Sequence, residues 1–249
     1  MFSSRAHPWK SLLAGWIALA GSPAWGCGVA AEEATVARVD ERGDILFQDG
    51  RPARLAGIDA PGARARDIFA RGWEGKSVRI ALLAPRPDRW GRWLVDIFDQ
   101  AGGSAAIDLL SAGAALVRPE FETKGCETER LEAESAARAA HEGFWSERGA
   151  VLDPTDLETL ALHDGRFVLI EGTVRRVGVG RSRVYLDFGR RGGFTAVVAR
   201  KLDSAFSRRG VSLATLAGSR IRVRGVLENR FGPRIEIVDP LMIERAEGP

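Results

Sequence analysis

The sequence predicts a protein of mixed α and β structure (α+β), mainly β, built from two small units. The chain has 249 residues, which is long enough for two small domains. Apolar and β-branched residues recur in short runs separated by glycine, proline and Asp-Gly steps, a pattern typical of strands. Residues 106–145 change to helical spacing, and the segments on either side of residue 165 carry opposite charge. With 45% hydrophobic and 28% charged residues, the composition is that of a folded globular protein.

The first 31 residues are expected to form a secretory signal peptide. Arg5 and Lys10 precede an apolar run at residues 11–21 that is too short to span a bilayer. Small residues predict cleavage after Ala31, with cleavage after Ala24 as the alternative. We therefore expect an exported protein, periplasmic or secreted, with no stable membrane span in the mature chain. A buried N-terminal helix is the alternative interpretation of the same run.

The state of the two cysteines depends on that cleavage site. Cleavage after Ala31 removes Cys27 and leaves Cys126 without an internal partner, whereas cleavage after Ala24 keeps both thiols. A lipid anchor on Cys27 is a third alternative, although the residues before it match the usual lipoprotein signal poorly.

The first unit, residues 34–147, begins with strands and ends with helices. Its first two apolar runs are joined by Gln48-Asp49-Gly50, and an Asp-Gly step between such runs predicts a β-hairpin. The later segment is rich in Ala, Glu and Arg at helical spacing. After the hairpin we expect, in order, a helix at 66–75, strands at 77–84 and 92–98, and helices at 106–118 and 127–145.

A linker and a second, strand-rich unit follow. Glycine and proline break the pattern at residues 148–164, around a short helical phrase at 153–162. The second unit, residues 165–245, is nearly all strand. Five strands with a helix among them are the inventory of a small Greek-key barrel of the oligonucleotide-binding type. The strands are expected at 166–178, 183–189, 194–199, 219–229 and 233–244, and the helix at 199–210.

The second unit is basic and the first is acidic. Residues 165–249 hold 17 Lys or Arg against 8 Asp or Glu, a balance of +9, and residues 32–164 have a balance of −8. A basic module favours a polyanionic partner such as single-stranded DNA or RNA, and a generic basic surface is the alternative.

One predicted strand of the second unit carries a row of arginines. Arg220, Arg222 and Arg224 alternate with apolar residues, which places them on one face as candidate nucleic-acid-binding residues. The alternative is that they keep an edge strand soluble. The candidate stacking aromatics, each of which could equally be a core residue, are Tyr185, Phe188, Phe194 and Phe231.

The stretch RLAGIDAP, residues 54–61, has Arg54 and Asp59 near the two ends of a short strand, where they could simply be solvated. Together with GDILFQDGR, DRWGRWLVDIF, LLSAGAALVRPE and EGFWSE, in this order, it resembles the staphylococcal nuclease (thermonuclease) family over residues 34–147. The resemblance implies an oligonucleotide-binding barrel with appended helices, so we expect two small barrels of this type. It also implies hydrolysis of DNA and RNA with Ca²⁺.

The resemblance assigns roles to four residues. Arg54 and Arg92 correspond to the two guanidinium groups that clamp the phosphate, and Asp59 to a Ca²⁺ ligand. Asp44 is the candidate second Ca²⁺ carboxylate, although an ungapped count from Arg54 places Gly43 there, and a one-residue slip in a strand reverses the face.

The chain departs from the family at the general base. Gly62 stands where the family has its glutamate, so that role is unfilled, and Asp67 is a weak substitute. Loss of a general base lowers a rate by about 10² to 10⁴. We expect an exported, thermonuclease-like protein that binds nucleic acid, with weak or altered phosphodiester hydrolysis and a doubtful need for Ca²⁺. The alternative is a catalytically inactive scaffold that binds nucleic acid, another polyanion or a protein.

Overall fold

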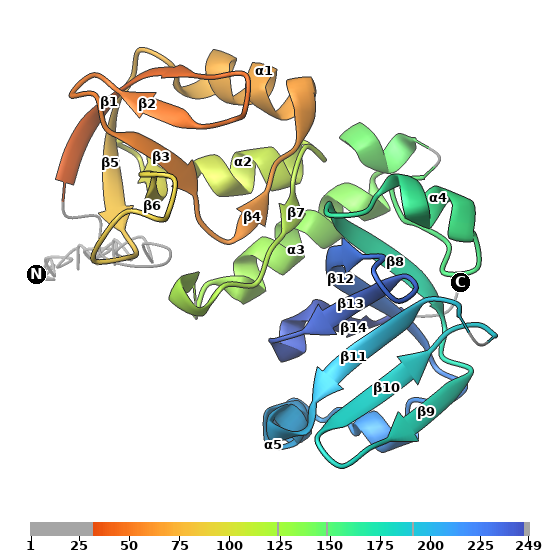
Figure 1. Ribbon diagram of the computed structural model, residues 1–249. Coiled ribbons are helices and arrows are strands. Elements are labelled where there is room, and N and C mark those ends of the chain that lie inside the picture. Colours follow the sequence, from red (N-terminus) through yellow and green to blue (C-terminus); the bar gives the residue numbers. More distant parts are fainter. Residues whose placement is uncertain (1–31, 124, 148, 191, 247–249) are drawn as a thin grey trace, which may run out of the picture.

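The computed structural model describes residues 32–123, 125–147, 149–190 and 192–246 of the chain. The expected signal peptide at residues 1–31 lies outside them. Figure 1 shows a mixed α and β architecture of two units, one from each half of the sequence, which confirms the predicted fold class. Helix α3 (Glu127–Ala139) lies between the two units. No helix in the described part of the chain is long and apolar enough to cross a membrane.

The first unit contains a closed five-strand barrel in the order β1-β2-β3-β6-β5. The pair β3–β6 is parallel and the other neighbours are antiparallel. The predicted hairpin is confirmed: β2 and β3 pair through Ile45 and Ala53, and Gly50 takes the positive φ of 87° that its turn requires. The strands are β1 (Glu32–Val39), β2 (Ile45–Phe47), β3 (Pro52–Leu55), β5 (Ser77–Leu82) and β6 (Trp93–Phe98).

Helices pack against the barrel and contribute to its core. Helix α1 (Gly62–Trp73) buries Phe69 and Trp73, and α2 (Ala105–Ser111) buries Leu109 and Leu110. These side chains join one apolar core with the inward residues of the strands. A short ladder, β4 (Ile58–Asp59) with β7 (Leu116–Val117), lies beside the barrel. Two 3₁₀ turns complete the unit, at Phe121–Thr123 and Gly143–Ser146.

The predicted helix at 106–118 is wrong in its second half. Helix α2 ends at Ser111, and residues 116–117 form β7 instead. Gly113 has a φ of 56°, and a Cβ there would lie 2.0 Å from the carbonyl oxygen of Glu142. The chain therefore stops being helical where it meets a segment about thirty residues later, which spacing alone does not reveal.

The second unit is a curled half-barrel sheet in which β12 (Arg220–Glu228) pairs with β8 (Phe167–Thr173), β13 and β14. The hydrogen-bonded path runs β12-β13-β11-β10-β9. Because β8 and β9 are consecutive halves of one chain segment, this is the strand order of the first barrel with its first strand broken. The parallel pair β11–β13 corresponds to β3–β6. The remaining strands are β9 (Arg176–Val179), β10 (Arg183–Asp187), β11 (Thr195–Ala199), β13 (Arg234–Ile237) and β14 (Ile243–Arg245).

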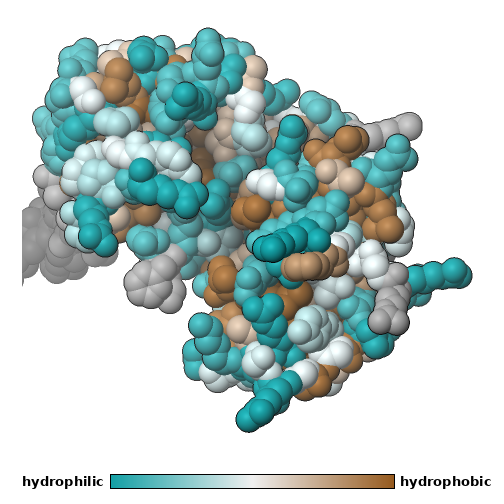
Figure 2. All heavy atoms as spheres, viewed as in Figure 1, coloured by the Kyte–Doolittle hydropathy of each residue, from teal (hydrophilic) through white to brown (hydrophobic). Residues whose placement is uncertain are grey.

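Both units are consistent with oligonucleotide-binding-like folds. Two short helices accompany the second sheet, α4 (Leu157–Leu162), capped by Asp156, and α5 (Asp203–Arg208). Phe188 and Phe194 are buried in its core, whereas Tyr185 and Phe231 are exposed. The three short 3₁₀ turns of this unit are Arg200–Leu202, Leu213–Thr215 and Pro240–Met242. Figure 2 shows a mostly hydrophilic surface over the first barrel and larger apolar areas over the second unit.

A buried joint holds the two units together. The guanidinium of Arg224 on β12 donates to both carboxylate oxygens of Glu134 on α3, at 2.8 and 2.9 Å, and both side chains are 1% exposed. The Arg224 guanidinium also donates to the Val117 carbonyl oxygen at 3.1 Å. An apolar cluster that includes Leu116 and Leu169 packs across the same boundary.

Candidate functional site

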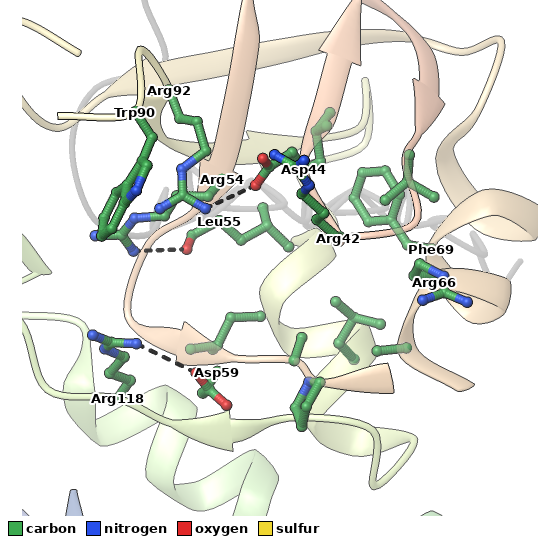
Figure 3. Close-up of a pocket in the computed structure, with 18 residues that line it drawn as sticks. Arg42, Asp44, Arg54, Leu55, Asp59, Arg66, Phe69, Trp90, Arg92 and Arg118 are labelled. Carbon is green, nitrogen blue, oxygen red and sulfur yellow. Dashed lines mark hydrogen bonds and ion pairs between the residues drawn. The ribbon is translucent and has the colours of Figure 1, made fainter. Parts of the chain in front are cut away.

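The candidate residues of the first unit meet in one pocket of about 400 Å³. Arg54, Arg92, Asp44 and Asp59 all line it, and Figure 3 shows them around a common hollow. The two guanidinium groups predicted to act together therefore reach the same space, and Asp44 faces it despite the one-residue ambiguity in its strand. The interpretation of Arg54 and Asp59 as unrelated solvated strand ends does not fit this geometry.

Local structure fixes where Arg92 points. It precedes β6 in a tight turn in which Gly91 has a φ of 80°. The Asp88 carboxylate accepts from the backbone N–H groups of Trp90 and Arg92 at 2.9 and 3.0 Å. It also accepts from the Arg92 side chain at Nε and Nη2, at 3.0 and 2.9 Å. Burial alone would raise the pKa of Asp88, but these hydrogen bonds outweigh it and lower the pKa.

The third contact of Arg92 is with the candidate metal ligand Asp44. The Arg92 Nη1 donates to Asp44 Oδ1 at 2.8 Å. Arg54, on β3, is held in a similar way by Glu120, whose two oxygens accept from Nη1 and Nη2 at 3.2 and 2.7 Å. Glu120 also accepts the backbone N–H of Gly57 at 3.0 Å. Each clamp arginine is therefore positioned by a carboxylate before any ligand arrives.

The sequence did not single out Arg118 and Glu120 as site residues. Arg118 follows β7, lines the pocket and donates to Asp59 Oδ1 at 3.3 Å. Burial raises the pKa of Asp59 above its ordinary value, and the Arg118 guanidinium opposes that rise. Both missed residues lie in the segment LLSAGAALVRPE. Two charged residues directly after a predicted apolar segment were the feature that could have identified them as site residues.

The pocket is rich in cations and has an aromatic rim. Among the described residues, those that line it include five arginines and two carboxylates. Trp90 is 63% exposed at the rim, with the guanidinium carbons of Arg89 and Arg92 at 3.9 and 4.9 Å from its ring centroid. Guanidinium groups bind phosphate in a bidentate manner, and an exposed indole is a stacking surface for a base. The arginines are Arg42, Arg54, Arg66, Arg92 and Arg118.

The donor set for Ca²⁺ is weak. Asp44 and Asp59 are each paired with an arginine. Within the described ranges, no group of three or more His, Cys, Asp or Glu side chains is placed to hold a metal ion. Ca²⁺ takes six to eight oxygen ligands, so these residues alone do not make such a site. We derive no chemical step through Ca²⁺, and its involvement stays a prediction.

The position at which the resemblance implies a general base has no carboxylate, because residue 62 is glycine. Gly62 begins α1 with a φ of 84°, a conformation that L-residues rarely adopt. Asp67 is exposed on α1 and is not among the described residues that line the pocket. Cys126 is disulfide-bonded, so its sulfur is not a free nucleophile.

The arginine row of the second unit is not the open row that the alternation predicted. Arg224 is buried against α3, where a nucleic acid strand cannot reach it. Arg220 and Arg222 both donate to Glu171 through Nε, at 2.7 and 2.5 Å. The alternation holds, but α3 covers one end of the face. Nucleic-acid binding by Arg220 and Arg222 stays a prediction.

Comparison with known proteins adds no identity. No protein-family model matches the chain, and no curated protein matches it significantly. The geometry of the pocket is therefore the main indication of function.

Proposed function

We propose that this protein binds the sugar–phosphate backbone of single-stranded nucleic acid, DNA or RNA, in the arginine pocket of its first barrel. The convergence of five arginines in one pocket carries the proposal. Arg54 and Arg92 would clamp phosphate oxygens, and Trp90 would stack on a neighbouring base. Because Arg92 uses three of its five N–H donors on Asp44 and Asp88, it keeps donors for a phosphate.

Hydrolysis of the bound phosphodiester would be weak or altered. Two arginines can stabilise the charge that develops on phosphorus, which is a large part of such catalysis. The absent carboxylate at Gly62 removes the usual means of activating water. The same observation, with the weak metal donor set, favours the second candidate function, a catalytically inactive binding protein.

A binding experiment tests the proposal. We expect a labelled single-stranded oligonucleotide to bind the protein, with affinity that falls as salt rises. Arg92→Ala should weaken binding about tenfold to a hundredfold, because a charge-assisted hydrogen bond contributes about 1.5–3 kcal/mol. The matched control is Arg176→Ala, since Arg176 is 78% exposed on the other unit. Equal affinity of Arg92→Ala and wild type would reject the proposal.

A product-release assay separates the two candidate functions. Acid-soluble product from single-stranded DNA would be measured with Ca²⁺, with Mn²⁺ and with chelator. Release that needs both the metal and Arg92 would indicate slow hydrolysis. Binding without such release would indicate an inactive binding protein.

Export to the periplasm or the medium belongs to the same proposal. It depends on residues 1–31, and it is tested by fractionating cells that express the full chain. Recovery of the protein only in the cytoplasm would reject it.

A further inference from the structure

A second hollow adjoins the arginine pocket, at the boundary between the two units. Its volume is about 800 Å³, within the range of about 300–1,000 Å³ typical of ligand pockets. Both units contribute to its walls. Its lining includes Leu116, Arg118 and Phe144 from the first unit and Arg166, Phe167 and Val226 from the second.

The two hollows share part of their walls. Asp59, Pro61 and Arg118 line both of them. Arg118 bridges the boundary, because its Nη1 donates to Asp59 at 3.3 Å while its guanidinium carbon lies 5.5 Å from the ring centroid of Phe167. One end of a ligand at Arg54 and Arg92 could therefore pass Arg118 into the second hollow without leaving the surface.

The second hollow, like the first, combines apolar and aromatic walls with charged groups. Phe144, Phe167 and Val226 give it apolar and aromatic walls, and Val226 is 40% exposed. Within the part of the chain that the structure describes, its charged and polar lining consists of three arginines, one histidine and two carboxylates: Arg64, Arg118, Arg166, His163, Asp59 and Glu147. The aromatic walls suit a flat, apolar-faced base, and the five arginines of the neighbouring pocket suit its phosphate.

The hollow is pre-formed. The buried Arg224–Glu134 pair and the apolar cluster around Leu116 and Leu169 fix the units on either side of it. A ligand would not have to bring its walls together, which lowers the ordering cost of binding.

We infer that the hollow between the units binds a nucleobase of the strand whose phosphate occupies the arginine pocket. The strand then runs from the first barrel onto the second unit, and the binding site is incomplete without both. This inference rests on the proposed function, and it adds a second base subsite to the stacking position at Trp90.

The test compares two ligands that carry the same phosphates. One is a short single-stranded oligothymidylate, and the other is its abasic analogue of equal length. Wild type should bind the oligothymidylate about fivefold to a hundredfold more tightly, because stacking of one base contributes about 1–3 kcal/mol. Phe167→Ala should lower this preference about fivefold or more, while the share from Trp90 remains, and should leave binding of the abasic strand unchanged.

A second variant avoids the packing role of Phe167. Val226→Trp fills the hollow from an exposed strand position that tolerates an aromatic residue, without changing charge. Its matched control is Val238→Trp, because Val238 is 67% exposed and does not line the hollow. Val226→Trp should lower the preference for the base-bearing strand to the same extent as Phe167→Ala, and Val238→Trp should keep the wild-type preference.

The outcomes distinguish this inference from the proposed function. If neither ligand binds, the proposed function fails. If both bind equally and depend on Arg92, the proposed function stands and the base subsite is rejected. If the preference keeps its wild-type size in both Phe167→Ala and Val226→Trp, it comes from another position such as Trp90, and the inference is again rejected.

Discussion

Each clamp arginine of the pocket is paired with carboxylates, so the site is a set of positioned cations with only a small local excess of charge. Asp88 holds Arg92 and Glu120 holds Arg54 from outside the lining of the pocket, whereas Asp44 lines it. A bound phosphate would meet Asp44 as a like charge. Of these carboxylates, Asp44 is therefore the one whose removal should favour an anionic ligand.

Asp44→Asn should strengthen oligonucleotide binding in chelator about fivefold, because a nearby negative charge costs about 1 kcal/mol in a well-solvated site. Arg92 would stay in place, since Asp88 still holds it through two donors. The control is Asp49→Asn, an acid paired with Arg51 in the β2–β3 turn. Anisotropy titration checks the result. Weaker binding of the variant in chelator would contradict this prediction and would mean that Asp44 is needed to position Arg92. If Ca²⁺ raises the affinity of wild type but not that of Asp44→Asn, Asp44 is a Ca²⁺ ligand.

A buried pair between β6 and α3 makes stability depend on pH. Asp96, 1% exposed, accepts from Arg130 Nη2 at 2.5 Å. Burial raises the pKa of Asp96 from its ordinary 3.8 to about 6, and the Arg130 guanidinium only partly opposes this. The folded state thus binds the proton of the Asp96 carboxyl more tightly than the unfolded state does. The contribution of this protonated carboxyl to the free energy of unfolding is full below pH 4 and is lost as pH rises to about 6.

The free energy of unfolding of wild type, minus that of Asp96→Asn, should therefore fall by up to about 3 kcal/mol between pH 4 and 6. Above pH 6 the difference should be constant. Urea unfolding of both proteins at several pH values checks this, and a difference that does not change with pH would contradict the assignment. Taking the difference removes the contribution of the other carboxylates.

At the scale of elements, local sequence was sufficient where the deciding contacts are local. The Asp49-Gly50 turn and the alternation along β12 predicted a hairpin and a strand that the structure contains. The end of α2 was missed because Gly113 meets Glu142, a tertiary contact. The order of the strands in the second unit follows the first barrel, but the break between β8 and β9 follows no pattern that we can read in the sequence.

Helix α1 offers a test of the conformation at its first residue. Gly62 has a φ of 84°, in the left-handed region, whereas the φ of Gly72, in the last turn of α1, lies outside that region. At both positions an added Cβ would have no other atom within 4 Å. Gly62→Ala should destabilise the protein by about 1 kcal/mol or more, and Gly72→Ala should stabilise it by up to about 1 kcal/mol. Thermal or urea unfolding checks the two signs.

The same position bears on catalysis. Gly62→Glu would place a carboxylate where the resemblance to the thermonuclease family implies a general base. The backbone at residue 62 has a positive φ, so this glutamate would be strained. We expect lower stability and no gain in metal-dependent product release. A clear gain would show that the site lacks only its base.

At the scale of the molecule, the sites depend on pairs that are distant in sequence. Arg54 meets Glu120 66 residues later, Asp59 meets Arg118 59 residues later, and Glu134 meets Arg224 90 residues later. The resemblance to the thermonuclease family predicted Arg54, Asp59 and Arg92 as site residues from the sequence. It could not place Arg118, and the pattern along β12 could not reveal that α3 buries Arg224.

The Arg224–Glu134 pair should decide whether the two units behave as one body. Glu134→Gln keeps the volume but leaves the buried Arg224 cation with Glu244, at 3.3 Å, as its remaining carboxylate partner. Breaking a buried pair typically costs about 3–5 kcal/mol, and Glu244 should keep the loss toward the lower end. We expect a lower unfolding midpoint, a separate transition for each unit and a larger radius of gyration in solution scattering. The preference for a base-bearing strand should fall as well, because the hollow between the units loses one wall.

Two further variants separate charge from packing at this joint. The double variant Glu134→Leu with Arg224→Met replaces the pair by apolar groups and should recover part of the lost stability. Recovery should be incomplete because the buried Val117 backbone N–H and C=O groups lose their partners Glu134 and Arg224. Arg176→Gln breaks the exposed pair with Asp187 and should change stability by about 1 kcal/mol or less. If Glu134→Gln is no more costly than Arg176→Gln, the joint does not depend on the pair, and the rigid hollow between the units would need another explanation.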